Sequence, residues 1–64
     1  MTQTILRLPL VKARTGLGRS SIYLRISHGA FPKSISLGGR AVGWIESEIQ
    51  NWISERVEQS RSAA

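Results

Sequence analysis

The chain has 64 residues, no cysteine and a formal net charge of +5 at pH 7. A fold of this length buries only about 60% of its unfolded surface, so we expect one small domain with a compact apolar core. The absence of cysteine excludes disulfides and thiolate zinc sites. No apolar run approaches the ~20 residues needed to span a bilayer, and residues 1–10 lack the order of a signal peptide. We therefore expect a soluble, intracellular protein.

The charges are unevenly placed along the chain. Seven of the nine lysines and arginines lie before Glu46, in a stretch without aspartate or glutamate. All four acidic residues follow: Glu46, Glu48, Glu55 and Glu58. A surface of one sign over most of a domain favours a polyanionic partner such as nucleic acid. The alternative is a basic protein without a specific ligand.

The first elements predict a short helix. Residues 5–8 alternate in polarity, which indicates a short strand or extended segment. Pro9 suits the first position of a helix, and Gly16 can take the left-handed conformation that ends one. We therefore expect a helix over residues 9–15. Its apolar face would consist of Leu10, Val11 and Ala13.

A second helix is expected from residue 18 or 19 to Gly29. Ile22 and Ile26 are four positions apart and therefore share one face, which is the predicted core face. Leu17 is expected to fill the space in the turn between the two helices. Two short helices joined by a tight glycine-containing turn predict a helix-turn-helix.

A hairpin and a final helix follow. We expect strands over 33–37 and 40–44, joined by Gly38-Gly39, a pair typical of tight turns. A hairpin directly after a helix-turn-helix is the wing of a winged-helix unit. Apolar residues at helical spacing then predict a helix over 45–57. The fold class is thus α+β and mostly helical, a winged helix-turn-helix over residues 1–58 with a flexible tail over 59–64.

The sequence contains no residue pattern typical of catalysis or cofactor binding. The serines lack a base with an orienting group, because the single histidine, His28, has no acid near it in sequence. Gly16-Leu17-Gly18 begins like a dinucleotide loop, but Ser21 stands where the third glycine belongs. One histidine and four late acids give no metal-ligand cluster. We expect no enzyme activity, no cofactor and no metal.

The outer face of the second helix is the candidate nucleic-acid surface. Away from the core face lie Ser20, Ser21, Leu24, Arg25 and His28, and beside it lie Arg19 and Tyr23. Small hydroxyls allow close approach to a duplex, and Arg25 can reach the O6/N7 edge of guanine. Tyr23 either donates its hydroxyl to a phosphate or packs against the wing. Leu24 has three interpretations: contact with a thymine methyl, contact with a neighbouring protein, or partial burial.

The wing and the aromatic residues complete the prediction. Lys33 and Arg40 lie at the base and tip of the hairpin, where we expect contacts to phosphates or to an adjacent minor groove. The apolar periodicities assign four residues to the core: Phe31, Val42, Trp44 and Trp52. The alternative for the two tryptophans is stacking on single-stranded bases.

The segments ARTGL-RSSIY, G-FPK, LGGRAVGW and ESEI--WI, within residues 7–53, closely resemble the AlpA family of prophage regulatory proteins. The family consists of small winged helix-turn-helix proteins related to phage excisionases. The resemblance implies binding to double-stranded DNA, with the second helix in the major groove. It carries the family's functional positions onto Arg19, Ser20, Ser21, Tyr23, Arg25, Lys33 and Arg40.

Two roles follow from the resemblance. One is a transcriptional regulator, for example of an integrase gene, that touches RNA polymerase. The other is an excisionase, a recombination directionality factor that binds and bends attachment-site DNA. We expect a cytoplasmic protein at the bacterial nucleoid that is monomeric in solution, with cooperative binding on DNA left open. A third alternative is an interaction module whose acidic last helix, with Glu46, Glu48 and Glu55 exposed, binds integrase or a response regulator.

The sequence departs from the family pattern at two positions. Gly18 stands where members often have a serine, which removes a side-chain cap from the second helix. Leu10 stands where many have an acidic or small residue. An exposed leucine there predicts a protein contact on the first helix.

Overall fold

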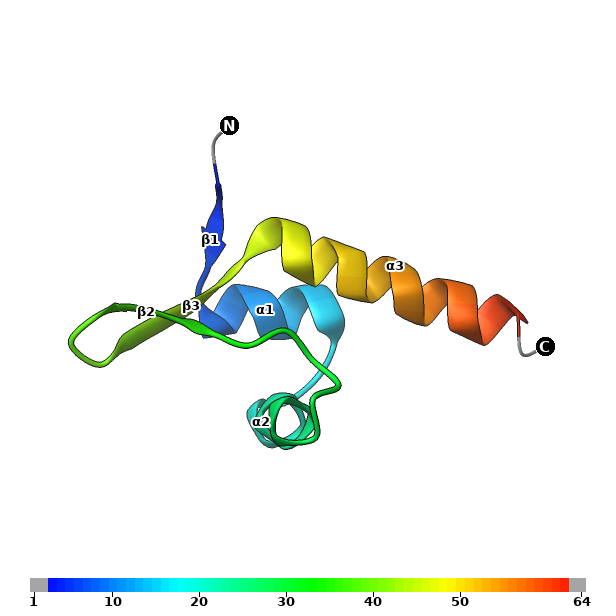
Figure 1. Ribbon diagram of the computed structural model, residues 1–64, viewed down its shortest axis with the longest axis horizontal. Coiled ribbons are helices and arrows are strands. Elements are labelled where there is room, and N and C mark those ends of the chain that lie inside the picture. Colours follow the sequence, from blue (N-terminus) through cyan, green and yellow to red (C-terminus); the bar gives the residue numbers. More distant parts are fainter. Residues whose placement is uncertain (1–2, 63–64) are drawn as a thin grey trace.

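The computed structural model describes residues 3–62, which form three helices and three strands. In chain order these are β1 (Ile5–Leu6), α1 (Leu8–Thr15), α2 (Arg19–Ser27), β2 (Ile35–Gly38), β3 (Ala41–Ile45) and α3 (Glu46–Ser62). Figure 1 shows the β2–β3 hairpin projecting from one end of the molecule and α3 extending toward the other, with α2 seen end-on below α1. The fold is α+β and consistent with the predicted winged helix-turn-helix.

Helix α1 begins one residue earlier than predicted and ends at Thr15, as predicted, with Gly16 as its C-cap. Gly16 has φ 73°, and its N–H donates to the carbonyl oxygen of Lys12 at 2.8 Å. The predicted apolar face is wrong for two of its three residues, because only Val11 is buried and Leu10 and Ala13 are exposed. The core-facing stripe is Leu8, Val11 and Thr15. These residues recur every three or four positions and so lie on one side of the helix.

The helix-turn-helix prediction is confirmed in its packing. Ile22 is fully buried, and Leu17 and Ile26 pack against the same core. Helix α2 begins at Arg19 after an extended Gly18 and ends at Ser27, two residues before the predicted Gly29. Because Gly18 has no side chain, no side-chain hydrogen bond caps the helix.

The strands form one three-stranded antiparallel sheet in the order β1-β3-β2. The hairpin lies later in sequence than predicted, since β2 begins at Ile35 and β3 ends at Ile45. Gly38 pairs with Ala41 across a register irregularity, which places the turn at residues 39–40 instead of 38–39. The pairing of β1 with β3 was not predicted.

Strand β1 passes so close to β3 that position 43 has no room for a side chain. A Cβ built on Gly43 would lie 2.5 Å from Cγ2 of Ile5 and 3.2 Å from the carbonyl oxygen of Leu6. The register explains this proximity, because Ile5 pairs with Ile45 and Leu6 with Trp44. Gly43 is therefore required by the three-stranded sheet and not by the hairpin turn.

The core lies between the sheet and the helices. Its buried members are Leu6, Val11, Ile22, Phe31, Trp44 and Ile49. The core assignment of the aromatic residues and Val42 is confirmed, because Val42 and Trp52 pack partly buried against this cluster. Trp44 is fully buried, so the alternative of base stacking is wrong for that residue.

The two tryptophans also tie down the segment between α2 and β2. The indole N–H of Trp44 donates to the carbonyl oxygen of Pro32 at 3.1 Å, and that of Trp52 donates to the carbonyl oxygen of Ala30 at 2.8 Å. The ring of Phe31 meets the ring of Trp52 edge-on, with 4.8 Å between centroids. These contacts fix how the wing leaves α2.

Helix α3 is longer than predicted. The predicted end at residue 57 is wrong, since the helix continues to Ser62. No glycine or proline interrupts this stretch, and the Arg56 guanidinium donates a hydrogen bond to the Gln59 side chain one turn later. The division into a domain over 1–58 and a tail over 59–64 remains a prediction, and residues 63–64 lie outside the described part. None of the helices in residues 3–62 is long and apolar enough to cross a membrane.

Candidate nucleic-acid interface

The outer face of α2 is open along its whole length. Ser20, Ser21, Leu24 and His28 are all exposed, and Leu24 is exposed by 58%. Partial burial, one of the three interpretations of Leu24, is therefore wrong. The face consists of small hydroxyls around one leucine and contains no acidic side chain.

Arg25 lies at the edge of this face and not within it. Its side chain is half-buried, whereas the prediction placed it among the residues pointing away from the core. Position 25 directly precedes Ile26 and is three residues from Ile22, so helical geometry places it beside the core stripe. The N–H of Ala30 donates to the Arg25 carbonyl oxygen at 2.8 Å and folds the following loop back against this end of α2.

Tyr23 combines features of both of its interpretations. Its ring meets Trp44 edge-on at 6.3 Å between centroids, so it packs on the core beneath the wing. The residue is nevertheless 38% exposed. The Arg19 guanidinium lies 5.7 Å from the centroid of the same ring, at a distance typical of a cation–π contact.

A groove of roughly 600 Å³ runs between the start of α1, the start of α2 and the wing. It is lined by Arg7, Leu8, Pro9, Arg19, Tyr23, Arg40 and Val42. Three of the predicted site residues, Arg19, Tyr23 and Arg40, line this groove. Arg7 was not singled out from the sequence. The one signal pointing to it was its place in the acid-free stretch.

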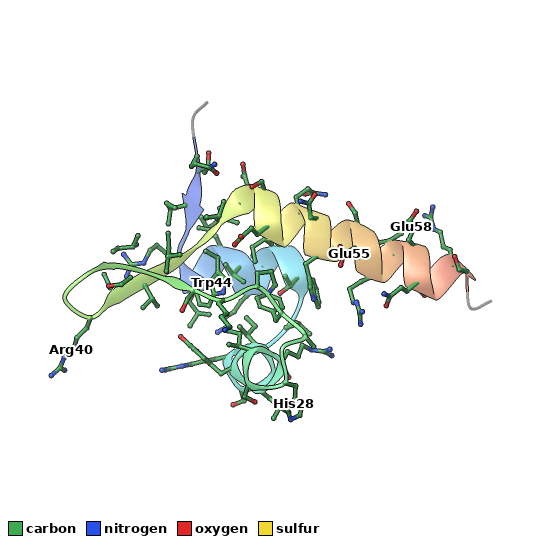
Figure 2. All side chains as sticks on the ribbon, in the orientation of Figure 1. His28, Arg40, Trp44, Glu55 and Glu58 are labelled. Atoms are coloured by element: carbon green, nitrogen blue, oxygen red, sulfur yellow. The ribbon has the colours of Figure 1, made fainter. Side chains whose placement is uncertain are left out.

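The wing residues reach outward. Arg40 is exposed in the turn between β2 and β3, and Lys33 is exposed two residues before β2. In Figure 2 the Arg40 side chain points away from the wing tip toward the side on which α2 and His28 lie. Glu55 and Glu58 lie along α3, apart from that side. The Arg40 side chain and these two acidic side chains thus lie on different parts of the molecule.

The acidic helix differs from its prediction at one residue. Glu46 is half-buried, and its Oε2 forms an ion pair with the Arg14 guanidinium at 2.9 Å. The prediction that Glu46 is exposed is therefore wrong. The reason is that α3 starts directly after β3, beside the end of α1. Glu48 and Glu55 are exposed, as predicted. Within residues 3–62, histidine and acidic side chains form no group of three or more able to hold a metal ion.

Comparison with known proteins gives matches over most of the chain. Residues 4–57 match the family model described as Prophage CP4-57 regulatory protein (AlpA). The chain is 45% identical over 58 residues to the DNA-binding transcriptional activator AlpA of Escherichia coli K12, covering 81% of this chain and 83% of that relative. It is 44% identical over 55 residues to Uncharacterized protein ORF88 of Enterobacteria phage P4, covering 86% of this chain. The chain spans 62% of that phage protein's own length.

Proposed function

The chain belongs to the AlpA family of prophage regulatory proteins, and from this premise we propose that it binds double-stranded DNA as a regulator of a prophage or integrative element. The observation that carries the proposal is the open, acid-free outer face of α2 with the wing beside it. The name of the Escherichia coli relative supports it. In this role the protein acts in the cytoplasm, at the nucleoid, without catalysing a reaction.

In the proposal, α2 lies in the major groove. Ser20 and Ser21 are small enough for the helix to approach the base edges closely, and the uncapped amides after Gly18 suit a phosphate. Leu24, at the centre of the face, contacts a thymine methyl group. Arg25, at its edge, reaches a guanine.

The remaining basic residues position the protein and do not select a sequence. Lys33 and Arg40 contact phosphates on the flank of the site, and His28 contacts a phosphate beyond the C-terminus of α2. Such contacts fix register and orientation but carry no base information. We propose that one monomer occupies one site, and that cooperation between neighbours arises only where sites adjoin.

Selection of bound DNA from random duplexes tests the proposal. We expect one short recurrent motif containing a guanine and a thymine. Recovery of duplexes without any common motif would contradict sequence-specific binding.

The proposed target is the promoter of an integrase gene. Footprinting of that promoter and of the attachment region, with the same protein preparation, tests this assignment. A regulator protects a single site at the promoter. Protection of several adjoining sites in the attachment region alone would instead identify a recombination directionality factor.

A second candidate function rests on α3. Glu48, Glu55 and Arg56 border a hollow of roughly 430 Å³ beside the partly buried Trp52. Its two carboxylates can pair with a basic segment of a partner protein. Integrase and a response regulator are the proposed partners of α3, and RNA polymerase is the proposed partner in the activator role. Retention of purified partner by the wild-type protein after DNase treatment, and its loss in the Glu48→Gln/Glu55→Gln variant, would support this function. Equal retention by both proteins would contradict it.

A further inference from the structure

Three arginines from separate parts of the chain converge on one groove. Arg7 immediately precedes α1, Arg19 is the first residue of α2, and Arg40 lies in the turn of the wing. All three line the groove of roughly 600 Å³ described above. These arginines are far apart in the sequence, so only the fold brings them together.

The positive charge in this groove is not compensated by the protein. No acidic residue lines it, and among residues 3–62 none of the three arginines forms an ion pair. Arg14 differs from these three arginines, because it forms an ion pair with Glu46 at 2.9 Å. Like charges held near one another raise the free energy of the folded state. A bound anion offsets that cost.

The walls of the groove suit a phosphate group in particular. Leu8, Pro9 and Val42 form an apolar side next to the three arginines. The ring of Tyr23, 5.7 Å from the Arg19 guanidinium, restricts where that guanidinium can lie. A planar guanidinium presents paired N–H donors that match two phosphate oxygens, which a lysine cannot do.

We propose that this groove binds a segment of the DNA backbone and that Arg7 is a phosphate ligand together with Arg19 and Arg40. The inference rests on the proposed function. The groove lies between α2 and the wing, so the strand it holds is the one that passes from the major groove to the wing. The groove contributes to affinity independently of base sequence. By holding this strand it also fixes the distance between α2 and the wing on the duplex.

The test compares Arg7→Gln, Arg7→Lys and the wild-type protein in binding to a duplex carrying the selected motif and to a random duplex, over a series of salt concentrations. Arg7→Gln is expected to lower affinity roughly tenfold and about equally on both duplexes, as the loss of a charge-assisted hydrogen bond predicts. The slope of log K against log[salt] should become less negative by roughly 0.9, the loss of one phosphate contact. Arg7→Lys should keep the wild-type slope while losing part of the affinity, because it retains the charge without the paired donors.

Arg61→Gln is the matched control, since it removes the same charge from the last turn of α3 and should leave the slope unchanged. Thermal unfolding of each variant verifies the fold. A wild-type slope in Arg7→Gln, with binding otherwise intact, would overturn the inference and leave the proposed function standing. Failure of the wild-type protein to bind any duplex would instead overturn the proposed function.

A second measurement distinguishes a DNA backbone from a free anion. Inorganic phosphate, titrated against chloride at equal ionic strength, should shift the side-chain NMR signals of Arg7, Arg19 and Arg40 only weakly, and the selected duplex should shift all three to saturation. Saturation by inorganic phosphate at low concentration, with no change of these signals on adding the duplex, would assign the groove to a free phosphate and overturn the inference.

Discussion

Substitution of Gly43 by alanine tests the sheet that positions the groove. The new Cβ would lie 2.5 Å from Cγ2 of Ile5 and 3.2 Å from both Cδ1 of Leu37 and the carbonyl oxygen of Leu6. Real Cβ atoms do not approach other atoms to 2.5 Å, so the Ile5 side chain must move. The Leu6 oxygen belongs to the backbone of β1, so the strand must shift with it.

Overpacking of this kind costs about 1–3 kcal/mol. Alanine recovers roughly 0.5–1 kcal/mol of that through its lower backbone entropy in the unfolded chain. The 2.5 Å clash places the overpacking cost in the upper part of this range, at about 2–3 kcal/mol. We therefore expect Gly43→Ala to lower the free energy of unfolding by about 1–2.5 kcal/mol. In a domain of this size each kcal/mol lowers Tm by roughly 4–8 °C.

Thermal and urea unfolding of Gly43→Ala, Ile5→Ala and the double variant measure the effect. The cost of Gly43→Ala should be smaller in the Ile5→Ala background, because the atom nearest to the new Cβ is then absent. An unchanged or raised Tm in the single variant would refute the close approach of β1 to β3. Because Arg7 follows β1 directly, the same shift should also weaken DNA binding.

The other predictions concern single groups on or near the interface. Tyr23→Phe keeps the ring against Trp44 and removes only the hydroxyl, so stability should change by less than about 0.5 kcal/mol. DNA affinity should fall if the hydroxyl donates to a phosphate. Unchanged affinity in a binding assay would assign Tyr23 to packing alone. Gly18→Ser should raise stability by roughly 0.2–0.5 kcal/mol in urea unfolding, because a serine side chain can cap α2 and no atom lies within 4 Å of its Cβ position. A fall in stability would contradict that capping geometry. Arg25→Ala should weaken binding to the selected motif more than to a random duplex, whereas Lys33→Ala should weaken both alike; equal losses for Arg25→Ala would make Arg25 a phosphate contact.

Local sequence patterns predicted the helix-turn-helix well. The spacing of Ile22 and Ile26 defined the core face of α2, and Gly16 marked the end of α1. Both signals act within one or two helical turns, so neighbouring residues suffice to determine them. The alternation along the hairpin predicted a wing, although its register moved once Gly38 paired with Ala41.

Features that depend on distant residues could not be obtained in the same way. The pairing of β1 with β3 joins residues 5 and 45, and β1 contributes only two residues of pattern. Glu46 looked like one of a series of exposed acids until the fold placed Arg14 beside it.

The convergence of the three arginines on one groove also depends on residues far apart in the chain. Arg7, Arg19 and Arg40 are ordinary basic residues along the chain, and they line one groove only because the start of α1, the start of α2 and the hairpin meet there. Charge counting identified the basic stretch that contains them. It gave no means of separating Arg7 from Lys12 or Arg14.

The salt dependence of wild-type binding to a duplex carrying the selected motif tests the central claim most directly. If α2, the wing and the arginine groove together neutralise ~4–6 phosphates, log K should fall linearly with log[salt] at a slope of roughly −4 to −5. A slope near zero would contradict the claim that this protein binds the DNA backbone through its basic face.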